Sequence, residues 1–191
     1  MKRPQRYLFI IMTVLLAVYL LLTRLPPTAA MALLCVLVLY VLVLFLWGRD
    51  LFFARRHAKR REWDKALLRF ERFEKKLLRA SWQRLAVVLY PSIYSLDGVA
   101  ITRNSIAQVL LNAGELDRAV QWLRSALQRD PLYPVPYVNL ALIAARRLDD
   151  VGAKREMTRA VQLGFDPSAA QRILHRALAA AEKGIEDRDR R

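Results

Sequence analysis

The first quarter of the chain is almost entirely apolar. Residues 7–23 carry no charged side chain, and neither do residues 25–48, so that only Arg24 separates the two runs. A helix that crosses a hydrocarbon core of about 30 Å needs roughly 20 apolar residues. The prolines at 26–27 cannot continue a helix and favour a tight turn. The pattern therefore predicts a hairpin of two transmembrane helices, at about 7–23 and 28–47.

A cleaved signal peptide is the alternative interpretation of the first run. Lys2, Arg3 and Arg6 supply the basic start that such peptides have, and the small residues at 30 and 32 resemble a cleavage site. The second run would anchor the protein in either case. Membrane attachment is therefore expected under both interpretations.

Basic residues gather immediately after the second apolar run. They are Arg49, Arg55, Arg56, Lys59, Arg60 and Arg61. Loops rich in Lys and Arg stay on the cytoplasmic side of a membrane, so both termini are expected to be cytoplasmic, at the cell inner membrane. The same six side chains are expected to attract anionic lipid headgroups, at roughly 1 kcal/mol each near the surface.

From Leu51 onward, apolar residues recur every three or four positions, which is typical of amphipathic helices. Such a helix is predicted over Glu62–Leu78, and its partner over Leu51–Arg60 would continue directly from the second apolar run. A further helix is predicted over Ala80–Leu89. Residues 49–99 are thus expected to hold basic juxtamembrane helices.

The most regular pattern lies between Arg103 and Pro131. Small and large apolar residues alternate there at helical spacing, at Ile106, Ala107, Leu110, Ala119, Leu123 and Ala126. The small residues allow two helices to approach closely. Gly114 is expected to end the first helix in a left-handed conformation, and Pro131 to end the second. Asp97 is expected to cap the first helix at its N-terminus.

The same pattern returns 34 residues later. The aligned pairs are Arg103/Tyr137, Ile106/Leu140, Ala107/Ala141, Ala119/Ala153, Leu123/Met157 and Ala126/Ala160. This pattern resembles the tetratricopeptide repeat, a 34-residue pair of antiparallel helices. In the second unit Leu148-Asp149-Asp150 stands where the first unit has its glycine turn.

The resemblance implies an all-α fold in which the transmembrane hairpin precedes a short helical-repeat domain, an α-solenoid. Repeats are expected at 100–133 and 134–167, with a capping helix at 168–183 and a disordered tail at 184–191. The unit within 49–99 would be a degenerate repeat, because Phe73 stands where the family has a small residue. Two good repeats are fewer than such a stack needs, so the flanking helices must pack onto them.

Tetratricopeptide repeats bind peptides and proteins along a concave groove, lined by the first helix of each unit. Carried over to this sequence, that groove would contain Asn104, Gln108, Leu111, Asn112, Val135, Val138, Asn139, Leu142, Arg146 and Arg172. The Asn and Gln side chains could bond an extended peptide backbone, and the Arg side chains a carboxylate. The alternative is that Asn104 and Asn112 only cap or solvate helices, while Val138 and Leu142 belong to the core. Some chaperone-docking relatives bind a C-terminal carboxylate with two Asn and several basic residues, and that set is incomplete here.

No pattern of residues indicates catalysis. Nucleotide-binding, zinc-protease and serine-hydrolase motifs are missing from the sequence, which has only two histidines, His57 and His175. Its one cysteine, Cys35, lies inside the second apolar run. We therefore expect no enzyme activity, no cofactor, no metal and no small-molecule substrate.

The net charge of +15 raises nucleic-acid binding as another possibility. The charge is concentrated beside the membrane, however, because residues 48–79 hold twelve basic residues against five acidic ones. No nucleic-acid motif accompanies it. Membrane lipids are therefore the expected target of this charge, rather than nucleic acid.

These features predict a membrane-anchored scaffold or adaptor that binds a protein or peptide partner at the cytoplasmic face of the membrane. Its architecture is similar to that of small membrane-anchored repeat proteins of bacterial type that help to assemble membrane complexes, including those of haem biosynthesis and photosystems. The alternative is an integral accessory subunit of a larger membrane complex, in which the hairpin makes the decisive contacts.

Overall fold

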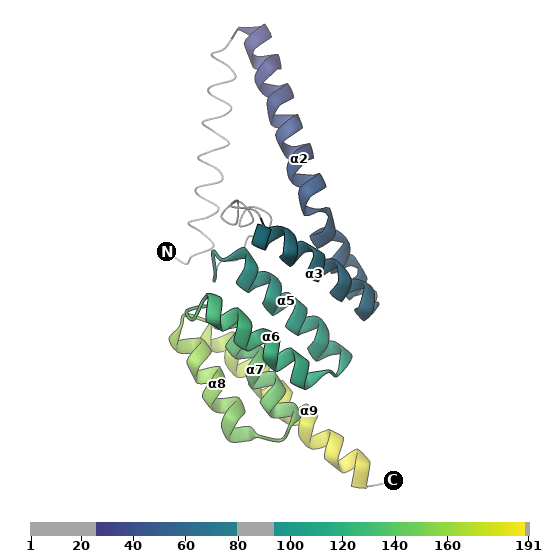
Figure 1. The fold of residues 1–191 in the computed structure, drawn as a ribbon. Coiled ribbons are helices and arrows are strands. Elements are labelled where there is room, and N and C mark those ends of the chain that lie inside the picture. The colour runs from purple at the N-terminus through teal and green to yellow at the C-terminus, as the bar shows by residue number, and fades with distance from the viewer. Residues whose placement is uncertain (1–25, 80–93, 190–191) are drawn as a thin grey trace. The chain divides into compact units, whose positions relative to one another are not determined.

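The computed structural model describes residues 26–79 and 94–189, which form helices joined by short turns (Figure 1). No strand occurs within these two ranges, so the described chain is all-α, as the sequence predicted. The first apolar run and the helix predicted at 80–89 lie outside the described residues. The chain divides into two units, Met1–Arg49 and Asp50–Arg191.

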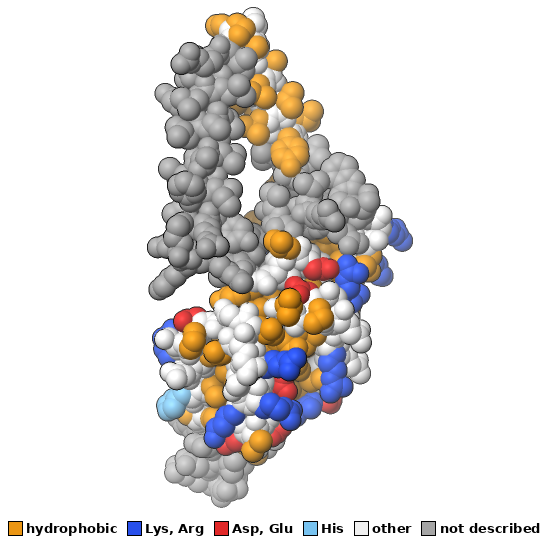
Figure 2. Space-filling model, turned by 90° about the vertical axis from the view of Figure 1, so that its left-hand side faces the viewer, with side chains coloured by type: hydrophobic (Ala, Val, Ile, Leu, Met, Phe, Trp, Pro, Cys, Tyr) orange, Lys and Arg blue, Asp and Glu red, His pale blue; other side chains and the backbone are white. Residues whose placement is uncertain are grey.

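Helix α2 runs from Pro27 to Lys59 and contains most of the second apolar run. Its first residue is a proline, which suits this position because the first turn of a helix needs no backbone N–H donor. Many of its large apolar side chains are exposed, as Figure 2 shows along the helix. They include Met31, Leu34, Val36, Leu37, Val38, Leu39, Leu42, Phe45 and Leu46. Among the described residues, no helix combines the length and the apolarity needed to cross a membrane, so the predicted hairpin gains no support from them.

The end of α2 and helix α3 (Trp63–Arg79) form a helical pair joined by a buried ion cluster. Asp50 has a side chain only 5 % exposed, and it accepts hydrogen bonds from Arg69, at 2.9 Å, and from Lys76. Burial by itself raises the pKa of Asp50, but the hydrogen bonds and positive charges of Lys76 and Arg69 outweigh that effect and lower the pKa. Asp50 therefore stays ionised, and its two ion pairs join the end of α2 to α3.

Five more helices are described after residue 93, in the unit Asp50–Arg191, which we call the repeat unit. They are α5 (Gly98–Ala113), α6 (Leu116–Arg129), α7 (Pro134–Arg146), α8 (Asp150–Gln162) and α9 (Pro167–Asp189). Helices α5, α7 and α9 are neighbours and form one layer, which we call the inner layer; α6 packs against α5 and α7, and α8 against α7 and α9 (Figure 1). Helix α3 packs against α5 on the side away from α9.

Small residues allow these helices to pack closely, as the sequence predicted. Ala107, Ala119 and Ala126 are fully buried in the first helix pair, and Ala141, Ala153 and Ala160 in the second. Between them lie Ile106, Leu110 and Leu123, which expose no surface. Phe73 of α3 is also fully buried, although the resemblance predicted a small residue at this position.

The helix ends follow the predicted capping residues. The Asp97 carboxylate accepts a 2.8 Å hydrogen bond from Ala100 N at the start of α5. Asp149 caps α8 in the same way, through Gly152 N at 2.8 Å. At the other end of the first pair, α6 stops at Arg129, and the next residue is extended because a proline follows it. Helix α9 was expected to end at 183, but it continues to Asp189, since one glycine costs a helix only about 1 kcal/mol.

The turns between paired helices repeat with the 34-residue period. Gly114 has φ +89° and Leu148 has φ +62°, so both adopt the left-handed conformation. The hydrogen bonds around them match, because Glu115 N donates to Leu110 O and Asp149 N to Ala144 O, each at 2.9 Å. The conformation of Gly114 was predicted. That of Leu148 was not, because a leucine carries a steric cost there of roughly 1–2 kcal/mol.

Replacing Leu148 by glycine is expected to raise the free energy of unfolding by about 0.5–1 kcal/mol. Glycine removes the steric cost of a positive φ, and this gain exceeds its own entropic cost. Leu148 is 54 % exposed, so little apolar burial is lost. Urea unfolding of the full chain in detergent micelles, followed by circular dichroism, measures the change.

Two controls accompany this substitution. Gly114→Ala is expected to lower the free energy of unfolding by about 1 kcal/mol. A Cβ atom at Gly114 would have no neighbour within 4 Å, so that loss would come from the backbone conformation alone. Leu132 is 70 % exposed and has no positive φ, so Leu132→Gly is not expected to raise the free energy of unfolding. If the free energy of unfolding of Leu148→Gly does not exceed that of the natural protein, the positive φ at Leu148 carries no steric cost.

Candidate peptide-binding face of the helical repeats

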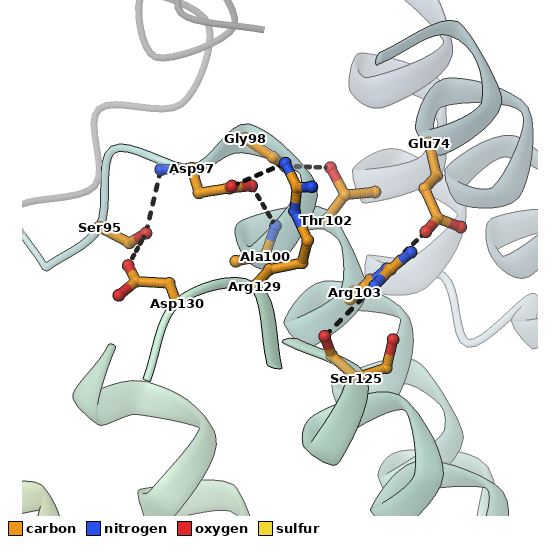
Figure 3. A network of polar contacts seen from close by, with 10 residues as sticks. All are labelled: Glu74, Ser95, Asp97, Gly98, Ala100, Thr102, Arg103, Ser125, Arg129 and Asp130. Carbon is orange, nitrogen blue, oxygen red and sulfur yellow. Dashed lines mark hydrogen bonds and ion pairs between the residues drawn. The ribbon is translucent and has the colours of Figure 1, made fainter. Parts of the chain in front are cut away.

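A polar network joins α5, one helix of the inner layer, to α3 and α6 (Figure 3). Arg103 lies on α5 and donates through Nε to Glu74 Oε1 of α3 at 2.6 Å. Its guanidinium also donates to the carbonyl oxygen of Ser125 on α6, at 3.2 Å. At the start of α5, Arg129 donates to Asp97 at 3.0 Å. One arginine thus joins three helices, and α5 is fixed relative to α3 and α6.

Two asparagines of the predicted groove form a pair between α5 and α7. Asn139 Nδ2 donates to Asn104 Oδ1 at 2.8 Å, and the two residues are 5 % and 6 % exposed. An asparagine side chain has two donor hydrogens and an acceptor oxygen. Among the described residues, the amide nitrogen of Asn104 and the amide oxygen of Asn139 have no other hydrogen-bond partner. The pair therefore retains one unused donor group and one unused acceptor.

A second contact joins the same two helices at their other ends. Arg146 donates to the carbonyl oxygen of Leu111 at 2.6 Å. That carbonyl belongs to the last turn of α5, where it also accepts a 3.3 Å hydrogen bond from Gly114 N, and a positive charge is favourable there. Asn104, Asn139, Leu111 and Arg146 thus lie in two cross-helix pairs, both with a separation of 35 residues.

The remaining groove positions divide by exposure. Val138 is buried in an apolar cluster with Met157 and Ala170, so it belongs to the core. Half-buried positions are Val135 and Leu142. Exposed positions are Gln108 and Asn112 on α5 and Arg172 on α9. These three polar side chains and Arg146 are the exposed part of the predicted groove.

The six basic residues predicted to face lipid all have exposed side chains. Arg49, Arg55, Arg56 and Lys59 lie on α2, while Arg60 and Arg61 form the turn that follows it. Arg61 has φ +59°, the same left-handed turn conformation as Gly114 and Leu148. In the part of the chain that the structure describes, no group of three or more His, Cys, Asp or Glu side chains could hold a metal ion.

The role of Arg103 in fixing α5 was missed by the sequence analysis. The repeat register did contain a signal, because Arg103 aligns with the aromatic Tyr137, at a position that faces a neighbouring helix. An arginine at such a position needs a buried acceptor. That acceptor, Glu74, lies 29 residues earlier, in the unit where the repeat pattern is degenerate.

No protein-family model matches this chain, and no curated protein matches it either. The likeness to tetratricopeptide repeats therefore rests on the residues and the internal geometry described above.

Proposed function

We propose that this protein is a membrane-anchored scaffold of tetratricopeptide type, which binds a protein partner at the cytoplasmic face of the membrane. The observation that carries the proposal is the geometric repeat. Turns at Gly114 and Leu148 have the same conformation and hydrogen bonds, 34 residues apart, and the helices they join alternate between two layers. Helical repeats of this kind work through extended binding surfaces rather than through catalytic groups.

The inner layer offers the chemistry that an extended peptide needs. A peptide unit has one N–H donor and one carbonyl acceptor. The unused amide nitrogen of Asn104 and the unused amide oxygen of Asn139 complement these two groups. Exposed Gln108 and Arg172 would then reach side chains or a carboxylate of the same peptide.

The membrane half of the proposal rests on other observations. Helix α2 exposes a long series of apolar side chains, and an exposed apolar surface of that extent marks a contact with lipid or with another protein. The six exposed basic residues from Arg49 to Arg61 would lie beside anionic headgroups. The described helices alone do not meet the requirements of a membrane span. The anchor is therefore proposed from the two uncharged runs of the sequence and from the exposed side chains of α2.

Photo-crosslinking in the membrane of living cells tests the binding face. A photoreactive amino acid in place of Gln108 or Asn112 is expected to give a discrete adduct with a partner protein. The matched controls are Gln121 and Gln128 of α6, which are also exposed but lie outside the inner layer. Adducts of equal yield from α6, or none from α5, would count against a peptide-binding inner layer.

The exposed apolar side chains of α2 also favour a second candidate, an integral accessory subunit of a larger membrane complex. In that case other membrane helices, rather than lipid, would cover them. Replacing residues 7–47 by an unrelated two-helix anchor separates the two. A scaffold would keep its function after this replacement, whereas a subunit whose hairpin makes the decisive contacts would lose it.

A further inference from the structure

Helix α3 exposes four basic side chains and one acidic side chain, Asp64 in its first turn. Its other two acidic residues lie further inward, since Glu74 is buried and ion-paired with Arg103, and Glu71 is half-buried. From residue 68 to the end of the helix, the exposed side chains are therefore only basic or apolar. They are Leu68, Arg72, Lys75, Leu78 and Arg79, which we call the basic face of α3.

The positive charges of this face are not balanced within the described chain. Arg72, Lys75 and Arg79 form no ion pair with any described carboxylate. Lys65, at the start of the same helix, does have a partner, because it lies 3.2 Å from Glu62. Three exposed like charges without a counter-charge on one helix favour an anionic partner.

Two exposed leucines lie among these charges and indicate which anionic partner fits. Leu68 is 49 % exposed and Leu78 is 48 % exposed. With about 100° between successive residues of a helix, Leu68 lies within the stripe formed by the three basic side chains. Nucleic-acid phosphates would gain nothing from these leucines. An anionic bilayer surface accepts both kinds of side chain, because basic groups meet its headgroups and apolar groups enter the acyl boundary.

Ion pairs bring this face back to the end of the second apolar run. Residues 60–62 connect α2 to α3, and both Arg69 and Lys76 of α3 reach Asp50, nine residues before the end of α2. Helix α3 therefore runs back along the last part of α2. Asp50 is the second residue after the uncharged run 25–48, which corresponds to about 3 Å along a helix. A headgroup layer is about 5–8 Å thick on each side of a bilayer.

We propose that the basic face of α3 binds the anionic headgroups of the bilayer that holds the apolar run. This inference rests on the membrane anchor proposed above, and it adds a second contact to the six basic residues from Arg49 to Arg61. Three basic side chains close to an anionic surface are expected to favour the contact about a hundredfold over contact with an uncharged surface.

Fluorescence quenching by lipid tests this contact in the full chain. A fluorophore is attached at Leu78→Cys, in a protein whose single cysteine is removed by Cys35→Ala. The protein is reconstituted in vesicles of phosphatidylglycerol and phosphatidylcholine that include a lipid with a nitroxide on its headgroup. We expect strong quenching, which becomes several-fold weaker in vesicles of phosphatidylcholine alone and in about 1 M salt, where the Debye length is only about 3 Å. A label at Val151→Cys, on an α8 side chain that is 78 % exposed, is the control and should not respond to lipid charge.

Charge reversal shows whether the basic side chains cause the contact. The triple variant Arg72→Glu/Lys75→Glu/Arg79→Glu should lose the dependence of quenching on phosphatidylglycerol. A matched triple variant makes the same change in net charge at exposed positions of α6, α8 and α9, and should quench as the natural protein does. Its substitutions are Arg124→Glu, Lys154→Glu and Arg176→Glu.

Flotation of the vesicles separates this inference from the proposed anchor. If the protein floats with the vesicles while the label at residue 78 is not quenched, the basic face does not bind lipid, although the anchor stands. If the protein does not float, the anchor and this inference both fail. Binding of a labelled RNA oligonucleotide that the α3 triple variant abolishes, with no quenching by lipid, would assign the face to nucleic acid and overturn the inference.

Discussion

Replacing Arg103 by alanine is expected to lower the free energy of unfolding by about 3 kcal/mol. The Glu74 side chain is only 9 % exposed, and in the variant its charge would lose its closest partner, now at 2.6 Å. Removing one partner of a buried pair typically costs about 3–5 kcal/mol, and the lower end applies because Arg103 is itself 19 % exposed. The carbonyl of Ser125 would lose its hydrogen bond as well. Urea unfolding of the full chain in micelles measures the loss.

Two further proteins make this result specific. Arg118 pairs with Glu115 on the surface, where both side chains are well exposed, so Arg118→Ala should cost less than about 1 kcal/mol. In the double variant Glu74→Leu/Arg103→Met no buried charge is left alone, and stability should return to within about 1 kcal/mol of the natural protein. If Arg103→Ala is no more harmful than Arg118→Ala, the ion pair does not hold α3 and α5 together.

The second large effect is expected at the membrane. Two arginines in the centre of each apolar run should release the protein from membranes, because each costs about 2.5–3.5 kcal/mol at the middle of a spanning helix. The substitutions are Leu15→Arg, Leu16→Arg, Leu37→Arg and Val38→Arg. We expect the natural protein to stay in the membrane pellet after alkaline carbonate extraction, and this variant to appear in the supernatant.

The control carries isoleucine at the same four positions, which keeps both runs apolar, and should stay in the pellet. Extraction of the natural protein by carbonate would remove the anchor from the proposal. Retention of the arginine variant would show that attachment does not depend on the apolar runs.

The sequence predicted the turns, helix ends and caps best where the 34-residue repeat is regular. Gly114, Pro131 and Asp97 are residues with strong local preferences, and the structure confirms the turn, the helix end and the cap predicted for them. The left-handed Leu148 could be located only by comparison with Gly114, since leucine disfavours that conformation. Before Asp97 the pattern is degenerate, so the 34-residue alignment could not be used there.

Side-chain partners were harder to predict than positions. The resemblance placed Asn104 and Asn139 in one groove, but not in contact with each other, and it gave Arg146 a ligand-binding role while in the structure it donates to Leu111. The period of 34 fixes which helix faces which. A hydrogen bond also depends on the reach and rotamer of both side chains, which a one-dimensional pattern does not contain.

Because each helix packs mainly against helices close to it in the chain, local unfolding can begin at one end of the stack. Stability in such a stack is a sum of neighbouring interfaces, so the two ends can loosen independently. Among the described helices, the main contacts of α9 are with α7 and α8, whereas α5 is packed between α3, α6 and α7. Amide hydrogens of α9 should therefore exchange with solvent earlier than those of α5.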